Sequence, residues 1–508
     1  MADLKSAQKL LQDVPRNDAL KALQEITDWI ESVRDNAHFH VDQLLDVLSL
    51  LDEAARPHMR KLMHEYFSAQ AQSKFQENRT WMVLNAFFTQ NELTYFKVLT
   101  AYRNGDKGSS AVKSSLALIA ARGIYAAMGR LKITAARYEQ VDVAVWEHML
   151  EFYSHAEVHQ YLNQPVKLYA TQTQETSVRN IFASVLMWYA SGSTTLRPLH
   201  MHLAERLAAH FCRRFMVDAQ ITSNSLICFN LALPGLPLRV TADTKPHPGM
   251  RFIGVGDVRP QLEALLKQLE KNIVPQDINF GGVYDADVLK VATRHLLSYW
   301  GAPPPMRRQA RRQVKLNMSV ALGFDRILEQ GAIDPGFDYQ FASTNDSGFI
   351  STWEVEDISA TGFRCVLPAK NAEGVRIGSL VGIKPENVGH NGVGIVRRLS
   401  RDGQNILHVG VEILSKQVEK ILLRAHGSSM SGGEQTAIWV RKPGDEVGEV
   451  FLLMNPHAFS MSRSLNTQFE GKGCLLIPLA LQERGGDYDL ARYRKVEEDS
   501  NAEVDETY

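Results

Sequence analysis

The two most informative stretches of this chain are Arg307-Arg308-Gln309-Ala310-Arg311-Arg312 and Asp357-Ile358-Ser359-Ala360-Thr361-Gly362. The first places four arginines within six residues, directly after a proline-rich hinge. An arginine side chain is a planar, permanently charged fork that binds two phosphate oxygens at once and can stack on a nucleobase. The second stretch predicts a tight turn with short polar side chains along one edge, where the glycine permits a positive φ or the close approach of a ligand. Together the two stretches predict a site that recognises and binds phosphate groups.

The arginine stretch resembles the RxxxR motif that precedes a small β-barrel in the PilZ domain family. Arg308 and Arg312, with Arg307 as a preceding arginine, match this motif. Arg307 and Arg311 match it equally well, so the register stays open. Taken alone, a basic cluster of this kind is more often a solvated patch or a nucleic-acid contact.

The downstream stretch resembles the (D/N)xSxxG motif, which lies on an early strand of the same barrel. Asp357, Ser359 and Gly362 match it without a gap, although a motif of this length alone is usually just a turn between strands. In the PilZ family the two motifs bind the bacterial second messenger cyclic di-GMP. The resemblance implies the same ligand here, with ligand-binding residues drawn from Arg307, Arg308, Arg311, Arg312, Asp357, Ser359 and Gly362.

The resemblance covers roughly residues 305–425, and this segment favours a barrel on its own terms. A first strand is predicted at residues 314–322, Asn391-Gly392 is a strong hairpin signal, and residues 406–413 alternate in part between apolar and polar side chains. Residues 324–347 are longer than a hairpin needs and predict an inserted loop. Residues 416–424 predict a short helix that could cap one end of the barrel.

Length and composition predict a folded protein of several domains. The chain has 508 residues, 44% hydrophobic residues and a net charge of −1, which suits two to four domains. The sequence pI near 7.0 argues against general nucleic-acid binding. Four cysteines without CxxC spacing predict reduced core thiols. We expect a cytoplasmic protein without a membrane span, because no signal-peptide pattern and no uninterrupted apolar run of about 18 residues is present.

Helical periodicity dominates the first 300 residues. Apolar residues follow helical spacing over residues 20–33, after Asn17-Asp18 as an N-cap, and again over residues 41–51 before Pro57 interrupts or kinks the helix. Residues 114–130 are apolar on nearly all sides and predict a helix buried in a bundle. A short β element is predicted near residues 225–255. Residues 287–300 predict a last helix before the hinge.

These patterns predict a multidomain α+β protein. Pro303-Pro304-Pro305 cannot continue a helix and favours a semi-rigid extended segment. The predicted domains are a mostly helical region at residues 1–300, a PilZ-like β-barrel with its hinge at 301–425, and a small β extension at 426–508. The extension begins with a flexible linker and ends in an acidic tail.

Other candidate sites have simpler interpretations. His155 and His159 share the four-residue spacing of metal ligands on a helix, but the glutamate that zinc proteases place beside the first histidine is missing. His200 and His202 are interpreted as surface or helix-end residues. The turn-like run 254–257 lacks the third glycine of a dinucleotide-binding loop.

Three further arginines, Arg397, Arg398 and Arg401, either add positive potential to the ligand site or form a solvated strand edge. We find no paired nucleophile and base and no constellation of metal ligands, so the sequence predicts no catalytic residues, no metal and no enzyme.

The sequence therefore predicts a cyclic di-GMP receptor that passes ligand binding to a protein partner through its helical region. In the mechanism that the resemblance implies, the hinge arginines close over the dinucleotide while Asp357 and Ser359 hydrogen-bond to it from the barrel. The alternative is an interaction scaffold with a degenerate PilZ domain that binds no nucleotide.

Overall fold

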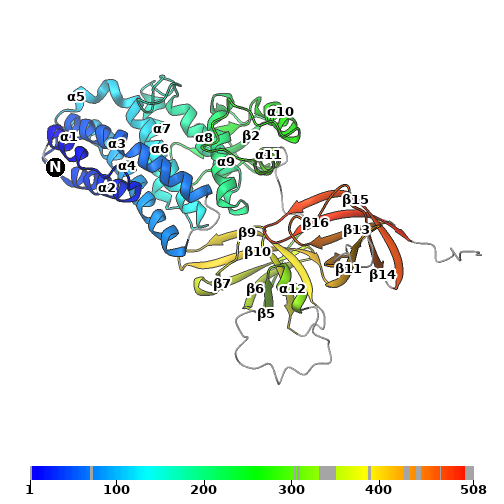
Figure 1. Ribbon diagram of the computed structural model, residues 1–508. Helices are drawn as coiled ribbons and strands as arrows, with labels where there is room; N and C mark the ends of the chain where they lie inside the picture. Colours follow the sequence, from blue (N-terminus) through cyan, green and yellow to red (C-terminus); the bar gives the residue numbers. More distant parts are fainter. Residues whose placement is uncertain are drawn as a thin grey trace, which may run out of the picture. The chain divides into compact units, whose positions relative to one another are not determined.

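The computed structural model describes residues 3–68, 73–301, 305, 309–330, 351–386, 391–427, 434–441, 448–469 and 471–497. The chain forms two compact units, Met1–Met306 and Arg307–Tyr508 (Figure 1). The first unit is mostly helical and includes one small sheet, and the second consists of two closed antiparallel β-barrels. The predicted α+β class, with a helical region followed by β-barrel structure, is confirmed.

The first unit begins with a helical bundle. Its main helices are α1 (Leu4–Gln12), α2 (Ala19–Asp35), α3 (Val41–Ser68), α4 (Lys74–Asn104), α6 (Leu116–Ala136), α7 (Val143–Val158), α8 (Val178–Ala190) and α9 (Pro198–His210), with a short α5 (Ser109–Val112) before α6. The predicted N-cap of α2 is confirmed, because the Asp18 carboxylate accepts a hydrogen bond of 3.0 Å from the amide of Lys21. Pro57 lies inside α3, so the helix continues through the proline.

Helix α6 lies in the core of the first unit, as its apolar sequence predicts. A Cβ atom on its Gly129 would lie 2.2 Å from the Phe88 ring of α4, so the absence of a side chain allows the two helices to approach closely. By length and composition the run Ser109–Ala136 could also cross a membrane, but most of its apolar part is buried, and core helices share this length and composition. The expectation of no membrane span stays a prediction.

A small antiparallel sheet follows the bundle. It contains β1 (Met216–Asp218), β2 (Ser225–Asn230), β3 (Leu238–Arg239) and β4 (Met250–Gly254) in the order β1-β4-β2-β3, which confirms the predicted β element. Helix α8 contacts β2 and β4 (Figure 1). Helices α10 (Val258–Glu270) and α11 (Ala286–Tyr299) complete the unit. One continuous hydrophobic core contains residues of the bundle, the sheet and both of these helices.

The second unit begins with the barrel that carries the two motifs. Its strands are β5 (Arg312–Leu322), β6 (Ser351–Ser359), β7 (Gly362–Pro368), β8 (Leu380–Pro385), β9 (Gly392–Arg401) and β10 (Ile406–Ser415), closed in the order β10-β7-β6-β5-β8-β9. Alternate side chains point inward, and Trp353, Phe363 and Val409 are fully buried. Closure leaves this barrel without a free edge strand.

A second closed barrel follows the first. It contains β11 (Glu419–Ala425), β12 (Gln435–Val440), β13 (Glu449–Met454), β14 (Leu465–Phe469), β15 (Lys472–Arg484) and β16 (Asp489–Glu497), in the order β11-β12-β13-β16-β15-β14. The helix predicted at residues 416–424 is therefore wrong. Ile421 and Leu423 alternate inward in β11 while Leu422 is 54% exposed, which is strand periodicity. Residues 428–433 of the predicted linker and the acidic tail from 498 lie outside the described residues.

The two barrels share a hydrophobic cluster. The predicted insertion after β5 begins with a short helix, α12 (Phe324–Gln330), and residues 331–350 lie outside the described part of the chain. Phe324 and Ile327 of α12 pack with side chains of both barrels, among them Ile395 of the first and Ile438 of the second. The Phe324 amide donates a hydrogen bond of 3.1 Å to the Asp487 carboxylate of the second barrel. The start of the insertion therefore joins the barrels.

Candidate functional site

Strand pairing brings the two motifs to the same end of β5, β6 and β7. β5 begins at Arg312, and the next residue, Gln313, lies opposite Asp357 on β6. β6 then turns into β7, with Ser359 opposite Gly362. The residues before β5 and the turn after β6 are therefore neighbours, although about 45 residues separate them in the sequence.

The arginines of the first motif differ in what they contact. Arg311 donates a hydrogen bond of 2.7 Å from Nη1 to Oδ1 of Asp357. Arg312 is exposed on β5 and forms no ion pair with a residue of the described ranges. Arg307 and Arg308 lie outside the described residues, so the register of the RxxxR motif stays open.

Asp357 is shared between two arginines. It is only 4% exposed, and its Oδ2 lies 3.1 Å from Nε of Arg364 on β7. Arg364 Nε is also 2.8 Å from Oε2 of Glu356. Neighbouring strand residues normally point to opposite faces, but the register between β6 and β7 shifts between Val355 and Asp357. This β-bulge turns both acidic side chains toward Arg364.

Further contacts between acidic and basic side chains extend from Glu356 to β10. Oε2 of Glu356 lies 3.5 Å from Nδ1 of His408 on β10, and Nε2 of His408 lies 3.3 Å from Oδ2 of Asp402. Glu356 Oε2, Arg364 Nε and His408 Nδ1 are buried and form no aligned hydrogen bond with one another, although they lie close together. The sequence does not predict this row of contacting side chains, because only the pairing of the strands brings them together. The only available signal was Arg364, two residues after the motif glycine.

Ser359 and Gly362 shape the turn itself. The Ser359 hydroxyl donates a hydrogen bond of 3.0 Å to the carbonyl oxygen of Gly362. A Cβ atom on Gly362 would lie 2.4 Å from the carbonyl oxygen of Val411 on β10. The glycine is thus required where β7 and β10 come close.

Arg397, Arg398 and Arg401 do not form one group. Arg397 donates to Glu412 of the same barrel and to Glu483 of the second barrel. Arg401 Nη1 donates to the Asn405 side chain at 3.1 Å, and Arg398 is exposed on β9. Arg397 therefore contributes its charge to the junction between the barrels.

The histidines of the first unit also differ from one another. His155 and His159 lie at the end of α7 with ring centroids 4.2 Å apart, and within the described ranges no group of three or more potential ligand side chains is placed to hold a metal. The interpretation of His202 as a surface residue is wrong, because this side chain is buried, although the residue does lie near the start of α9. Its Nδ1 lies 2.7 Å from Lys132 Nζ, and its Nε2 lies 3.1 Å from the Phe280 carbonyl oxygen. Burial, followed by the nearby Lys132, lowers the pKa of His202 to about 3.

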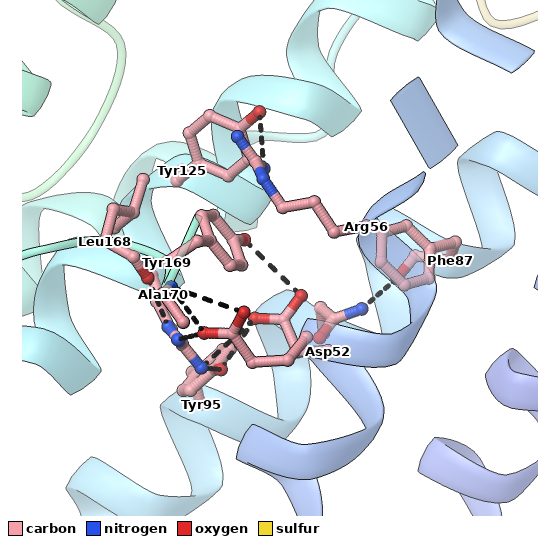
Figure 2. Close-up of polar contacts among 11 residues, drawn as sticks. Asp52, Arg56, Phe87, Tyr95, Tyr125, Leu168, Tyr169 and Ala170 are labelled. Atoms are coloured by element: carbon pink, nitrogen blue, oxygen red, sulfur yellow. Dashed lines mark hydrogen bonds and ion pairs between the residues drawn. The ribbon is translucent and has the colours of Figure 1, made fainter. Parts of the chain in front are cut away.

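A buried polar network occupies the centre of the helical bundle (Figure 2). Asp52 of α3 is 3% exposed and accepts hydrogen bonds of 2.8 Å from the Tyr95 hydroxyl and 3.4 Å from the Tyr169 hydroxyl. Nη1 of Arg122 lies 3.8 Å from Asp52 Oδ2. Burial raises the pKa of Asp52, and Arg122 opposes that increase. A buried acid thus has a cation and two hydroxyl donors around it.

The same network fixes the segment after α7. Arg122 Nε donates a hydrogen bond of 2.8 Å to the Leu168 carbonyl oxygen, and Arg122 also pairs with Glu53. The Arg56 guanidinium lies 3.7 Å from the centroid of the Tyr169 ring, which is a cation–π contact (Figure 2). The network therefore attaches residues 168–170 to α3, α4 and α6.

Comparison with known families places this network inside a recognised region. Residues 5–220 match the family model described as "Cyclic-di-GMP receptor FimW, N-terminal domain". The match covers less than half of the chain and does not include the barrels. No curated protein and no solved structure matches the chain.

The matched region ends at residue 220, just after β1, so it contains the helical bundle and the whole polar network. The described arginines of the first motif and the turn of the second lie outside it. The similarity to a cyclic di-GMP receptor and the PilZ-like motifs therefore come from different parts of the chain and are independent observations.

Proposed function

We propose that this chain is a receptor for cyclic di-GMP, and that the first barrel with the arginines before β5 binds the nucleotide. The observation that carries the proposal is the 2.7 Å contact between Arg311 and Asp357, because it joins the two motifs at one end of the barrel. The match of residues 5–220 to a family described as a cyclic di-GMP receptor supports the same ligand independently.

The chemistry of the site suits a cyclic dinucleotide. The guanidinium groups of the arginines would form paired hydrogen bonds with its two phosphates and with the edges of its guanine bases. A guanidinium group can also stack on a base. Asp357 and Ser359 would contribute polar groups from the β6–β7 turn. Such binding involves no bond breaking in the ligand, so we propose a receptor rather than an enzyme.

The helical unit is the part that we propose contacts a protein partner. Apolar side chains are exposed on it near the β3 edge, where Leu233 is 74% exposed and Leu238 is 64% exposed, and exposed apolar groups of this kind favour protein contacts. We also propose a cytoplasmic location. All four cysteines are free, which suits a reducing compartment.

A second candidate function is an interaction scaffold whose barrel binds no nucleotide. One observation favours it: Arg311 and Arg364 are already neutralised by Asp357 and Glu356. A phosphate would have to compete with these carboxylates. Measuring nucleotide binding separates the two candidates.

Isothermal titration calorimetry with cyclic di-GMP tests the proposal. We expect a dissociation constant in the micromolar range or tighter, which corresponds to about −8 kcal/mol or better. Arg308→Ala with Arg312→Ala should abolish binding if that register is used, and Arg307→Ala with Arg311→Ala if the other one is. Lys315→Ala is the matched control, because it removes a positive charge from the same strand at an exposed position. Wild-type protein without a heat signal would favour the scaffold.

A thermal measurement checks the same proposal without calorimetric titration. Ligand at about a hundred times its dissociation constant should stabilise the folded state by roughly 2.7 kcal/mol if only that state binds. An unchanged melting temperature at that concentration would count against a receptor.

A further inference from the structure

Asp357 forms ion pairs with two arginines, and the backbone of these two arginines is constrained to different degrees. Arg311 precedes the first residue of β5, whereas Arg364 lies inside β7 and is paired with β6 on one side and β10 on the other. The backbone at Arg311 can therefore shift without breaking strand pairing, whereas the backbone at Arg364 is fixed by pairing on both sides. Both reach the same buried carboxylate, at 2.7 Å and 3.1 Å.

A buried carboxylate needs a cation or hydrogen-bond donors to stay ionised. If Arg311 leaves Asp357 to bind a phosphate, the remaining partner within ion-pair distance among the described residues is Arg364. With Arg364 in place, the carboxylate keeps one cation throughout the exchange. Without it, nucleotide binding would leave Asp357 buried and unpaired, so Asp357 would compete with the ligand for Arg311.

We propose that Arg364 is a positioning residue that releases Arg311 for the nucleotide by keeping Asp357 neutralised. This inference rests on the proposed cyclic di-GMP function and deepens it. The bulge at Glu356 is part of the arrangement, because it places a second carboxylate 2.8 Å from Arg364 Nε and holds the guanidinium beside β6. Arg364 acts through Asp357 and has no contact with the ligand.

A double-mutant cycle measured by calorimetry with cyclic di-GMP tests this role. Arg364→Gln should weaken binding on the order of tenfold in the otherwise unchanged protein, because a coupling between contacting residues of this type reaches that size. In an Asp357→Asn background the same change should weaken binding less than about threefold, since no buried charge remains to hold Arg311. Arg364→Lys should restore most of the affinity.

Each contrary result has a distinct meaning. If the wild-type protein does not bind cyclic di-GMP, the proposed function fails, and this inference loses its basis with it. If the wild type binds and Arg364→Gln binds equally well, the inference alone is overturned. Equal losses in both backgrounds would show a direct contact of Arg364 with the ligand and would also overturn it.

A control variant and a measurement of folding separate the proposed role from the loss of one charge and from unfolding. Arg398→Gln removes an exposed arginine from strand β9 of the same barrel and controls for the loss of one positive charge. Melting curves identify a variant that does not fold. If Arg364→Gln is unfolded, Arg364→Met replaces it in the two Asp357 backgrounds, and a loss of affinity that persists with Asn at 357 contradicts the proposal.

Discussion

Arg397 on β9 and Glu483 on β15 face each other across the two barrels through two parallel hydrogen bonds, each 2.7 Å long. Arg397 also donates from Nε to Glu412 on β10 at 2.7 Å. Glu412 lies opposite Gly362 in the pairing of β10 with β7. One arginine thus connects the second barrel to the strand beside the turn of the candidate site.

We expect Arg397→Met to lower the free energy of unfolding of the second unit by about 1 kcal/mol, because the pair has two aligned bonds but remains partly exposed to water. Urea unfolding of the full chain measures the change. Arg424→Met is the control, since its ion pair with Glu434 is exposed and lies within the second barrel. A double-mutant cycle with Glu483→Gln that shows no coupling would contradict the assignment.

Gly362→Ala should destabilise the first barrel by about 1–3 kcal/mol, the usual cost of forcing an extra group into a closely packed site. Its new Cβ atom would lie 2.4 Å from the Val411 carbonyl oxygen, and backbone of this kind cannot turn aside as a flexible side chain can. Gly403→Ala is the matched control, because no atom lies within 4 Å of its Cβ position. Equal unfolding midpoints for the two variants in urea would refute the close approach.

The sequence predicts elements well where one local pattern continues over a long run. Helix α2 has both its cap at Asp18 and its buried face in a single stretch, and both are confirmed. The prediction of a helix at residues 416–424 was wrong because apolar residues such as Ile421 and Leu422 are compatible with the face of a helix as well as with a strand. In the structure β11 pairs with β12 and β14, and those partners lie further along the chain than a local pattern extends.

The candidate site is predictable only in part for the same reason. The motifs identify Asp357 and the arginines before β5. They do not predict that Asp357 contacts Arg311, or that Arg364 is a second cation beside it. Arg364 and Glu356 meet because a bulge shifts the register of two strands, and a bulge without a glycine leaves no clear mark in the sequence. His202 shows the same limit, since its partner Lys132 is 70 residues away.

Arg122→Leu should cost about 3–5 kcal/mol of stability, because it leaves Asp52 buried without its nearest cation. Far-ultraviolet circular dichroism during urea unfolding follows this change, since the first unit is mostly helical. The control is Arg103→Leu, whose ion pair with Glu151 is exposed and should contribute about 0–1 kcal/mol. A loss no larger than that of the control would show that the network does not depend on its charges.

His202 makes the stability of the first unit depend on pH. Its pKa is about 3 in the folded state, against an ordinary histidine value of 6.5, so between these values the unfolded chain binds a proton that the folded chain does not. Stability therefore falls as the pH is lowered through this window, by at most about 1.4 kcal/mol per pH unit.

His202→Gln should be less stable than the wild type at neutral pH but should lose less stability on acidification. Urea unfolding at about pH 7 and about pH 5 compares the two proteins while carboxylates stay ionised. His38→Gln, a change at an exposed position of the first unit, controls for the loss of one histidine. Parallel pH profiles for wild type and His202→Gln would contradict a buried neutral histidine.

The last prediction concerns how ligand binding could reach the helical unit. The chain divides between Met306 and Arg307, one residue after Pro303-Pro304-Pro305 and directly before the arginine stretch. A proline-rich segment is semi-rigid and transmits a reorientation better than a flexible one.

If the arginines close over cyclic di-GMP, we expect the distance distribution from small-angle scattering to change on ligand addition. Replacing the three prolines with Gly-Ser-Gly should abolish that change while calorimetric binding persists. Identical scattering of the wild type with and without bound ligand would instead favour a receptor whose barrel surface is read directly by its partner.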